Sequence, residues 1–585
     1  MSGRPMDGDG DGDRDDGDRG DGDRGDGDRG DGDRGDGPRG DGPRGDLDPA
    51  RTSRLDGLWP ALAIAVLAVL PWLVRVWPAE EEPRRLAVAH ALIVEDAPGS
   101  PYAGLVDPAA RVDPIYAFMV AAGRLVGVDA AGRLACSIAI AALCLAQWLL
   151  LRRLAPARWR NLYLLLPLAT GPLLLRGGTP IMLGLALGLT AIALVGPRLV
   201  DEARALDWRI GAAAAALLAV AGLTSPLGLL LCGAALVLLA GRRLVRPRAW
   251  PLPALLVVAA LPALARALVV LRAASYRRPL WMHARLDERV GAMLGSGLAT
   301  FSGWEGVLRR APVLCLVAGA LVAVRRRGPR GDGIDAAISR LVVGALLLAL
   351  LMPGVAGLPP CAELAADALL WTACGLALSL PGRSRPALLG AAGLALAAAL
   401  TLVQSRAMQG PAAALGDVLA AGRSIPRGSR VLPLRFAAPG AGAIDPLRHA
   451  WGHVAVERDI VTPFLAPAGG ALLSCASPLP APIARLPHLG EDAAARIQAI
   501  DPHRCAGVAE PAIDCGCEAW KAVRYAALLE AARSYDRLLV IAPPDDFLAA
   551  ARGALVPLAR AGDVQVFAPR AGAPAAPALL CEPEE

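Results

Sequence analysis

Between residues 57 and 408 the chain alternates between long apolar runs and short polar connections. A helix of about twenty apolar residues is long enough to cross a hydrocarbon core of ~30 Å. We therefore predict a transmembrane helical bundle of about eleven spans, although several runs are shorter than this length. The predicted spans are 58–77, 134–151, 162–175, 181–195, 210–223, 227–240, 252–271, 313–324, 341–352, 364–380 and 387–403.

The connections between these runs alternate in charge. Every second connection is rich in Arg, and the others are nearly uncharged, which is the pattern of short cytoplasmic and outer loops. This alternation predicts a multi-pass protein of the inner (plasma) membrane with a cytoplasmic N-terminus. It places the first outer loop, 78–131, the Arg-containing loop 272–310 and the C-terminal part outside the cytoplasm. The basic connections are 152–160, 198–209, 242–248, 325–330 and 383–385, and the uncharged ones are 176–179, 224–226 and 353–360.

The pattern changes near residue 409. Short runs typical of strands at 429–436, 535–541 and 564–567 alternate with helical spacing at 519–533 and 547–561. Such alternation predicts a small α/β extracytoplasmic domain over 409–570, which is long enough to bury its own core. The predicted fold class is therefore mainly α, with this domain appended and with 571–585 as a disordered tail.

The first 56 residues repeat Gly, Asp and Arg and have almost no apolar side chains. Such a segment cannot bury enough apolar surface to offset the entropy lost on ordering. We predict a disordered, low-complexity cytoplasmic tail that acts as a solvated spacer. Binding of a partner through its charge pattern is the alternative.

Composition agrees with a membrane protein. The chain has 585 residues, 55% of them hydrophobic and only 19% charged, and its mean hydropathy is +0.44. Soluble domains carry about 25% charged residues. The net charge of +6 hides an acidic tail and a more basic remainder. The Arg residues of that remainder lie in short loops between spans, so topology explains them and no nucleic-acid partner is predicted.

The eleven cysteines fall into two groups. Six lie in or beside apolar runs, where they are expected to be buried small side chains. The other five lie after residue 470, where one or two disulfides of unknown pairing are compatible with an oxidising compartment. Cys515 and Cys517 lack a second ligand pair at a spacing that binds metal.

Clustered carboxylates directly after the first span are the strongest candidates for chemistry. Glu80, Glu81 and Glu82 would lie at the membrane interface. Their crowding predicts that at least one pKa is raised by like-charge repulsion. We select Glu81 and Glu82 as catalytic candidates. The alternative is that these are solvated charges paired with Arg84 and Arg85.

Further polar residues of the first loop are weaker candidates. Asp96 follows the apolar stretch 86–94, which predicts an amphipathic helix on the membrane surface, and Asp96 is included among the catalytic candidates. Its alternative role is a solvated turn. Asp107 and Asp113 each precede proline, which is typical of turns. His90 is interpreted as a structural polar residue.

Arginines on the predicted outer side are candidates for binding an anionic group. Arg277 and Arg278 can grip phosphate oxygens in bidentate fashion, and Tyr276 beside them suits the headgroup level. Arg176, in a short outer turn, is a further candidate for substrate binding. Contact with membrane lipid headgroups is the alternative role for these residues.

The arrangement resembles the polytopic glycosyltransferases of the GT-C type, and within them an uncharacterised bacterial subgroup. There the first span is followed by Asp-x-Pro-x-His-Leu-Ala, which corresponds here to the run from Glu81 to Ala87, with Glu81 for the Asp and Arg85 for the His. The run 114–118 also resembles the return into the second span. The resemblance implies a GT-C-like fold with an outer C-terminal domain and transfer of a sugar from a polyprenyl-phosphate donor to a cell-envelope acceptor.

Other functions remain open. A non-catalytic membrane protein that scaffolds envelope assembly is the main alternative. Transport is disfavoured because the predicted spans are almost free of ionisable residues, which transporters use at mid-span. No cofactor is predicted, and dependence on a divalent metal is left open. The chain contains no phosphate-binding loop, nucleophile elbow or zinc-protease motif.

Overall fold

A computed structural model describes residues 54–103, 113–154, 156–200, 207–240, 386–436, 444–465 and 528–570, with shorter pieces between 257 and 356, at 494 and at 525–526. The chain divides into two units, Met1–Ser53 and Arg54–Glu585. Every described residue belongs to the second unit. The predicted disordered tails, apart from the helical residues 54–56, lie outside the described residues, as do most residues of the predicted spans between 252 and 380.

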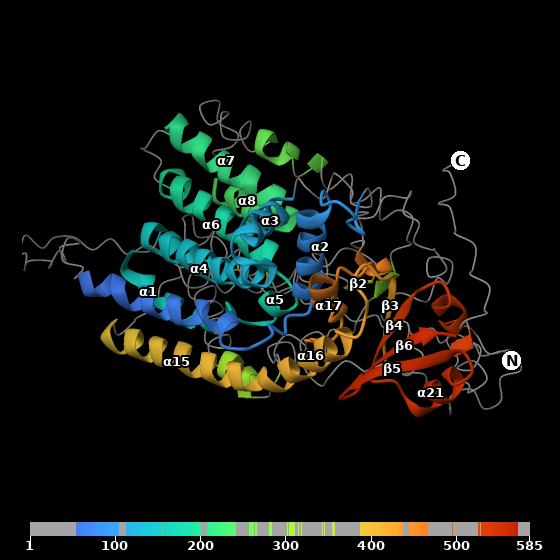
Figure 1. Cartoon of the computed structure of the whole chain (residues 1–585). Helices are drawn as coiled ribbons and strands as arrows, with labels where there is room; N and C mark the ends of the chain where they lie inside the picture. The colour runs from blue at the N-terminus through green and yellow to red at the C-terminus, as the bar shows by residue number, and fades with distance from the viewer. Residues whose placement is uncertain are drawn as a thin grey trace, which may run out of the picture. The chain divides into compact units, whose positions relative to one another are not determined.

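Helices dominate the part of the chain that the structure describes (Figure 1). Three of them are long and apolar enough to cross a membrane, at Val128–Leu154, Thr179–Arg198 and Ala391–Gly422. Shorter apolar helices accompany them. The helices that form this part are α1 (Arg54–Ala68), α4 (Val128–Leu154), α6 (Thr179–Val200), α7 (Trp208–Thr224), α8 (Pro226–Ala240), α15 (Pro386–Ala407) and α16 (Gln409–Gly422).

The first predicted span ends earlier than hydropathy indicates. Helix α1 stops at Ala68, and the 3₁₀ turn η2 (Leu70–Trp72) follows it. The freed carbonyls are satisfied by a side chain of α4, because the Arg133 guanidinium donates to the carbonyl oxygens of Pro71 at 3.1 Å, Val74 at 2.7 Å and Arg75 at 2.5 Å. A helix end buried without such donors would be costly.

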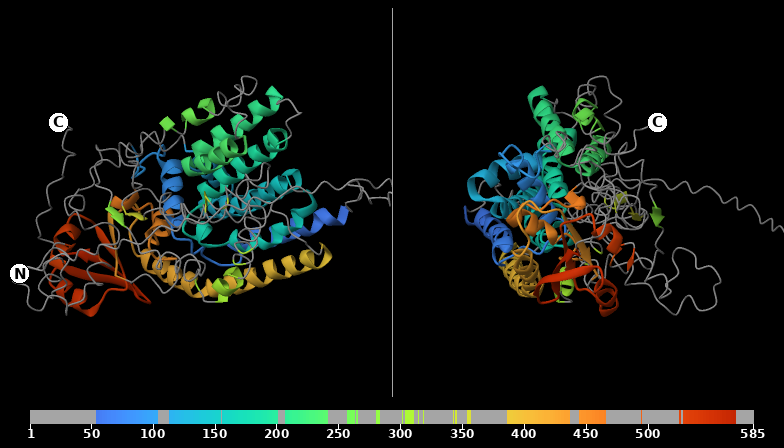
Figure 2. Two further views of the ribbon diagram at one scale, coloured as in Figure 1. Left: turned by 180° about the vertical axis from the view of Figure 1, so that it is seen from behind. Right: turned by 45° about the vertical axis from the view of Figure 1, so that its right-hand side comes forward.

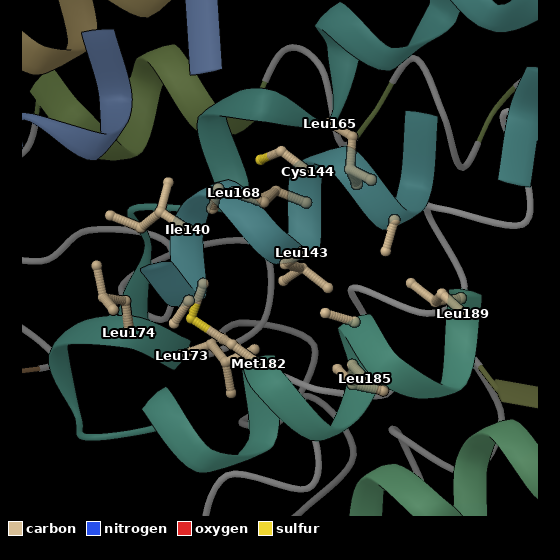
Figure 3. Close-up of a cluster of buried hydrophobic side chains, with 14 of the residues drawn as sticks. Ile140, Leu143, Cys144, Leu165, Leu168, Leu173, Leu174, Met182, Leu185 and Leu189 are labelled. Carbon is tan, nitrogen blue, oxygen red and sulfur yellow. The ribbon is translucent and has the colours of Figure 1, made fainter. Parts of the chain in front are cut away.

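The predicted span 162–175 is not one helix. It is divided among η4 (Pro156–Leu164), η5 (Leu166–Leu168) and α5 (Pro172–Leu175). Pro167 and Pro172 lack the N–H that a continuous helix needs, which explains the breaks. The segment is nevertheless buried, and its leucines pack against α4 and α6, as Figure 3 shows for Ile140, Leu143, Leu168, Leu173, Leu174, Met182 and Leu185.

A four-stranded mixed sheet forms near the C-terminus. Its strands are β3 (Val431–Arg435), β4 (Arg537–Ile541), β5 (Leu555–Ala561) and β6 (Val564–Pro569). Their order is β3-β4-β6-β5, with β3 parallel to β4 and the other neighbours antiparallel. The three predicted strands are confirmed. Elsewhere β1 (Leu280–Met282) pairs antiparallel with β2 (Gly354–Ala356).

The predicted helix 547–561 is wrong in its second half. Helix α21 spans only Asp545–Ala551, and residues 555–561 form β5. Gly553 and Pro557 interrupt a helix, and Gly562 makes the β5–β6 turn with a φ of +52°. This left-handed conformation favours glycine. Of the predicted helix 519–533, the described residues 528–532 are helical.

Three shorter helices bring the first loop against the C-terminal part. They are α2 (Glu82–Val94), α3 (Pro114–Val126) and α17 (Trp451–Arg458). Figures 1 and 2 show α17 beside α2, and α2 also contacts α3 and α4. The predicted helix at 86–94 is therefore confirmed, but most of its side chains are buried by these neighbours instead of lying on an open surface.

Candidate functional site

The three consecutive glutamates lie at the start of α2 and are all buried. Glu80, Glu81 and Glu82 expose only 8%, 6% and 2% of their surface. The backbone N–H of Glu80 donates to the carbonyl oxygen of Leu175 at 2.7 Å, which ties this run to the turn after α5. These residues are therefore not solvated charges. A buried carboxylate needs a hydrogen-bonding or ionic partner, since its desolvation is otherwise very costly.

Partners for two of the glutamates come from the C-terminal part of the chain. Arg448 Nη1 donates to Glu80 Oε1 at 2.6 Å. His449 Nε2 lies 2.9 Å from Glu81 Oε1. Both partners immediately precede α17. The loop after the first helix and the C-terminal part therefore build one site and lie on the same side of the helical bundle.

The remaining cations are local. Arg84 Nη1 lies 3.4 Å from Glu81 Oε2, and Arg85 Nη1 lies 3.4 Å from Glu82 Oε2. Arg85 also donates to the carbonyl oxygen of Gly177. The expected pairing of the glutamates with Arg84 and Arg85 is thus present, but it occurs in a buried site.

Glycines from three separate segments make room for this run. A Cβ on Gly177 would lie 2.2 Å from Glu81 Cβ, and one on Gly452 would lie 2.0 Å from the carbonyl oxygen of Pro83. A Cβ on Gly132 would lie 2.5 Å from Glu82 Oε1. Gly177 also has a φ of +95°, which favours glycine. The backbones of α4, α17 and the turn after α5 can approach α2 only because these positions lack side chains.

The three carboxyl groups ionise differently. Burial pushes the pKa of Glu81 up, but the charges of His449, Arg84 and Arg85 together outweigh it and hold that pKa well below its usual range. Burial raises the pKa of Glu80 against the opposing hydrogen bond and charge of Arg448.

The pKa of Glu82 is raised as well. Burial raises its pKa against the charge of Arg85, and Asp129 adds to the rise. The predicted rise is thus confirmed for Glu80 and Glu82, but its main cause is burial and not the crowding of like charges. Adjacent carboxyls whose pKa values are pushed apart are typical of acid–base sites.

Glu82 Oε1 and His453 Nε2 are among the buried polar atoms of this site that make no hydrogen bond to a nitrogen or oxygen of the described residues. The Cys136 thiol lies close enough to Glu82 to oppose the rise of its pKa. His453 is 7% exposed. Burial lowers its pKa to about 4 against the opposing charge of Asp129, with Arg133 adding to the fall. The imidazole is therefore neutral at pH 7, so it can accept or donate a hydrogen bond without a change of charge.

An apolar cavity of about 410 Å³ lies between α3, α4 and α6. It reaches the level of the acidic site, since its lining residues Ile115 and Ala135 also pack against Leu86 and Ala89 of α2. No lining residue is charged. The lining consists of Pro114, Ile115, Phe118, Ala135, Ile138, Ala142, Leu145, Ala146, Leu149, Leu183, Ala186, Leu187, Thr190 and Thr224.

The structure does not bring all of the predicted site residues together. Asp96 is exposed in the turn after α2, and the thirteen residues of this helix separate it from Glu82 by about 20 Å. Arg176 is half-buried beside Gly177 and so borders the site. Tyr276, Arg277 and Arg278 lie outside the described residues.

The remaining candidates of the first loop take structural positions. Asp113 caps α3 by accepting from the Ile115 N–H at 3.0 Å, while Asp107 lies outside the described residues. His90 Nε2 lies 2.7 Å from Asp459 Oδ1, in agreement with a structural role. Tyr102 Oη donates to the carbonyl oxygen of Ile460 at 2.8 Å. These contacts fasten α2 and its following turn to the end of α17.

Sequence reasoning missed Arg448, His449 and His453. The chain has only six histidines, and two of them stand four residues apart at 449 and 453. That spacing could have marked the segment as a site, but nothing in the sequence pairs it with Glu81. Within the part of the chain that the structure describes, no group of three or more His, Cys, Asp or Glu side chains is arranged to hold a metal ion.

No known family model and no curated protein matches the chain. Two solved structures align with it. ArnT from Cupriavidus metallidurans, bound to undecaprenyl phosphate, is 12% identical, with a TM-score of 0.41 over 88% of this chain and 98% of ArnT. The arabinofuranosyltransferase AftD from Mycobacteria is 16% identical, with a TM-score of 0.43 over 88% of this chain. The chain spans 40% of the length of AftD.

Proposed function

We propose that the protein is a membrane glycosyltransferase that transfers a sugar from a polyprenyl-phosphate donor to a hydroxyl of a cell-envelope acceptor. The observation that carries this proposal is the buried run Glu80–Glu82 directly after the first apolar helix, where the pKa of Glu81 is lowered and the pKa values of Glu80 and Glu82 are raised. Glycosyl transfer needs a carboxyl group that accepts the proton of the attacking hydroxyl. It also needs cations near the leaving phosphate.

Glu82 is the proposed proton acceptor. Its raised pKa brings it closer to the working pH, which makes it a better base than a strongly ionised carboxylate. Glu81 instead holds His449 and Arg84 in place. Glu82 is only 2% exposed and its carboxyl group faces α4, where a Cβ on Gly132 would lie 2.5 Å from Oε1. The acceptor hydroxyl therefore reaches it only when the packing of α2 against α4 opens.

The donor would lie along the membrane side of this site. The apolar cavity between α3, α4 and α6 suits a hydrocarbon chain, and its lining residues Ile115 and Ala135 adjoin α2. Arg176, with Arg277, Arg278 and Tyr276 of the outer loop, would hold the phosphate by charge-assisted hydrogen bonds. On this proposal the active site and the C-terminal part face the outside of the inner membrane.

The test is transfer of label by the purified full-length protein in lipid nanodiscs. The protein is offered a panel of polyprenyl-phosphate sugars, each carrying a radiolabelled sugar, together with envelope glycan acceptors. We expect transfer from one donor, and loss of at least about 100-fold in the double variant E81Q/E82Q, as for removal of a general base. Glu457→Gln is the matched control, because the Glu457 side chain is 36% exposed and, among the described residues, its ion pair is with Arg423. Equal transfer by the double variant and the control would overturn the proposal.

A second function is favoured by the same ion pairs. Arg448 pairs with Glu80 and His449 pairs with Glu81, so these contacts also hold the C-terminal part against the first loop. A non-catalytic protein that scaffolds envelope assembly would need only these contacts. Envelope glycans that are unchanged in a deletion strain would favour scaffolding, whereas loss of one glycan linkage would favour catalysis.

A further inference from the structure

A second buried ion pair lies outside the acidic site. Glu305 and Arg309 belong to the helical segment 304–310, and the side chains of both are 0% exposed. Arg309 Nη1 lies 3.6 Å from Glu305 Oε2. Burial of an ion pair in an apolar interior costs more than its attraction returns unless further hydrogen bonds compensate. The other hydrogen bonds of the Arg309 guanidinium therefore indicate which part of the structure the buried pair supports.

Those hydrogen bonds hold the turn between η5 and α5. Arg309 Nε donates to the carbonyl oxygen of Pro167 at 3.2 Å, and Nη2 donates to that of Thr170 at 2.9 Å. Nη2 also donates to Gln404 Oε1 at 3.1 Å. Gln404 Nε2 in turn donates to the same Thr170 carbonyl at 2.7 Å. Two helical segments far apart in the sequence thus converge on one carbonyl of this turn.

The turn continues directly into the acidic site. After Thr170 the chain forms α5 and closes with hydrogen bonds from Gly177 N to Leu174 O at 3.0 Å and from Gly178 N to Leu173 O at 2.7 Å. Leu175 O then accepts from the Glu80 N–H, and Gly177 O accepts from Arg85. The segment 167–178 therefore connects Arg309 to the glutamates through consecutive hydrogen bonds.

We propose that Arg309 is a positioning residue for the acidic site, acting through the segment 167–178. It fixes the carbonyls that set where Glu80 and Arg85 stand, and through them the surroundings of Glu81. Without the guanidinium, the Pro167 and Thr170 carbonyls would lose donors in an apolar interior. A role of Arg309 in catalysis rests on the proposed function. The structural coupling between Arg309 and the acidic site does not depend on it.

The test is a double-mutant cycle read by thermal unfolding of the full-length protein in detergent, so it needs no activity. Arg309→Met and Glu81→Gln are made singly and together. Independent sites give additive shifts of the unfolding midpoint, whereas coupled sites do not. We expect the shift caused by Arg309→Met at pH 7 to be clearly smaller in the Glu81→Gln background, because the ion pairs of Glu81 with His449 and Arg84 are already lost there. Additive shifts would overturn the inference.

Two further variants separate positioning from general destabilisation. Leu218→Ala removes a fully buried side chain from α7, which packs mainly against α6 and α8, and its shift should add to that of Glu81→Gln. Arg309→Lys keeps one charged donor and should restore part of the midpoint and of the coupling. It also supplies the cycle if Arg309→Met does not fold. Coupling for Leu218→Ala equal to that for Arg309→Met would contradict a specific role. A coupled Arg309 in a protein that transfers no sugar would leave this inference standing and remove only the proposed function.

Discussion

The interior between α4 and α6 and the interior around α2 are built in opposite ways. The first consists of Leu, Ile, Ala and Met side chains that any apolar residue of similar volume could replace at modest cost. The second packs three carboxyl groups against Arg, His and glycine backbone. Apolar packing is tolerant because it is non-directional. Buried ion pairs fail when one partner is removed, since the other charge is left unpaired. The predictions below probe that difference, from the largest expected effect to the smallest.

Glu81→Gln should have the largest effect on stability. It leaves His449 and Arg84 without their shared carboxylate in a buried site, and the loss of one partner of a buried pair costs about 3–5 kcal/mol. The measurement is the free energy of unfolding of the full-length protein in mixed micelles at pH 7. A loss below about 1 kcal/mol would be that of an exposed pair and would contradict the buried geometry.

The same variant should show a particular pH dependence. The pKa of Glu81 in the folded protein lies below its ordinary value of 4.5. Its ionisation therefore stabilises the fold above about pH 4.5, and this stabilisation is lost as the pH falls toward the folded-state pKa. The difference in unfolding free energy between wild type and Glu81→Gln should shrink as the pH falls below about 4.5. A difference that grows in acid would reverse the assigned sign.

Gly452→Ala should cost about 1–3 kcal/mol, as is typical of overpacking. The new Cβ would lie 2.0 Å from the Pro83 carbonyl oxygen, so α17 would have to move off α2. Gly416→Ala in the middle of α16 is the matched control, because a Cβ there meets no atom within 4 Å. Helix propensity predicts that the control is neutral or slightly stabilising. Equal unfolding midpoints for the two variants would show that α2 and α17 do not approach this closely.

Arg448→Met should cost about 1–2 kcal/mol, the range for a hydrogen bond to a charged group that is partly open to solvent. The Arg448 side chain is 27% exposed, whereas its partner Glu80 is 11% exposed. Unfolding in mixed micelles at low and high salt is the measurement. A loss that vanishes at high salt would mean that the pair is more exposed than this geometry allows.

Arg423→Met should have the smallest effect, within about 1 kcal/mol. It breaks the ion pair with Glu457, whose two side chains are 61% and 36% exposed. The same unfolding measurement applies. A loss as large as that of Glu81→Gln would remove the distinction between buried and exposed pairs on which the comparison depends.

The apolar region was largely predictable from the sequence, and the acidic region was not. Hydropathy located α4, α6, α7 and α8 because it is a property of each residue alone and needs no knowledge of distant contacts. It failed at residues 162–175, where prolines break an apolar segment that is buried in short turns. It also failed at residues 555–561, because the pattern of apolar residues alone did not separate a helix from one strand of a hairpin.

The acidic site depended on contacts that no local pattern contains. Glu81 was selected because it follows the first span, but its partner His449 stands 368 residues away. The roles of Gly132, Gly177 and Gly452 follow from three backbones meeting around α2, which spacing along the chain does not reveal. The predicted rise of a glutamate pKa was correct in direction, yet its main cause is burial, and burial is set by the tertiary fold.

The most direct test of the account is the side of the membrane on which the acidic site lies. The contacts of Glu80 with Arg448 and of Glu81 with His449 join the first loop to the C-terminal part, so one reporter locates both. Alkaline phosphatase, which is active only outside the cytoplasm, and green fluorescent protein are fused separately after Glu585. The account predicts an active phosphatase and a dark fluorescent protein. An inactive phosphatase with a bright fluorescent protein would place the site in the cytoplasm and contradict transfer at the outer face.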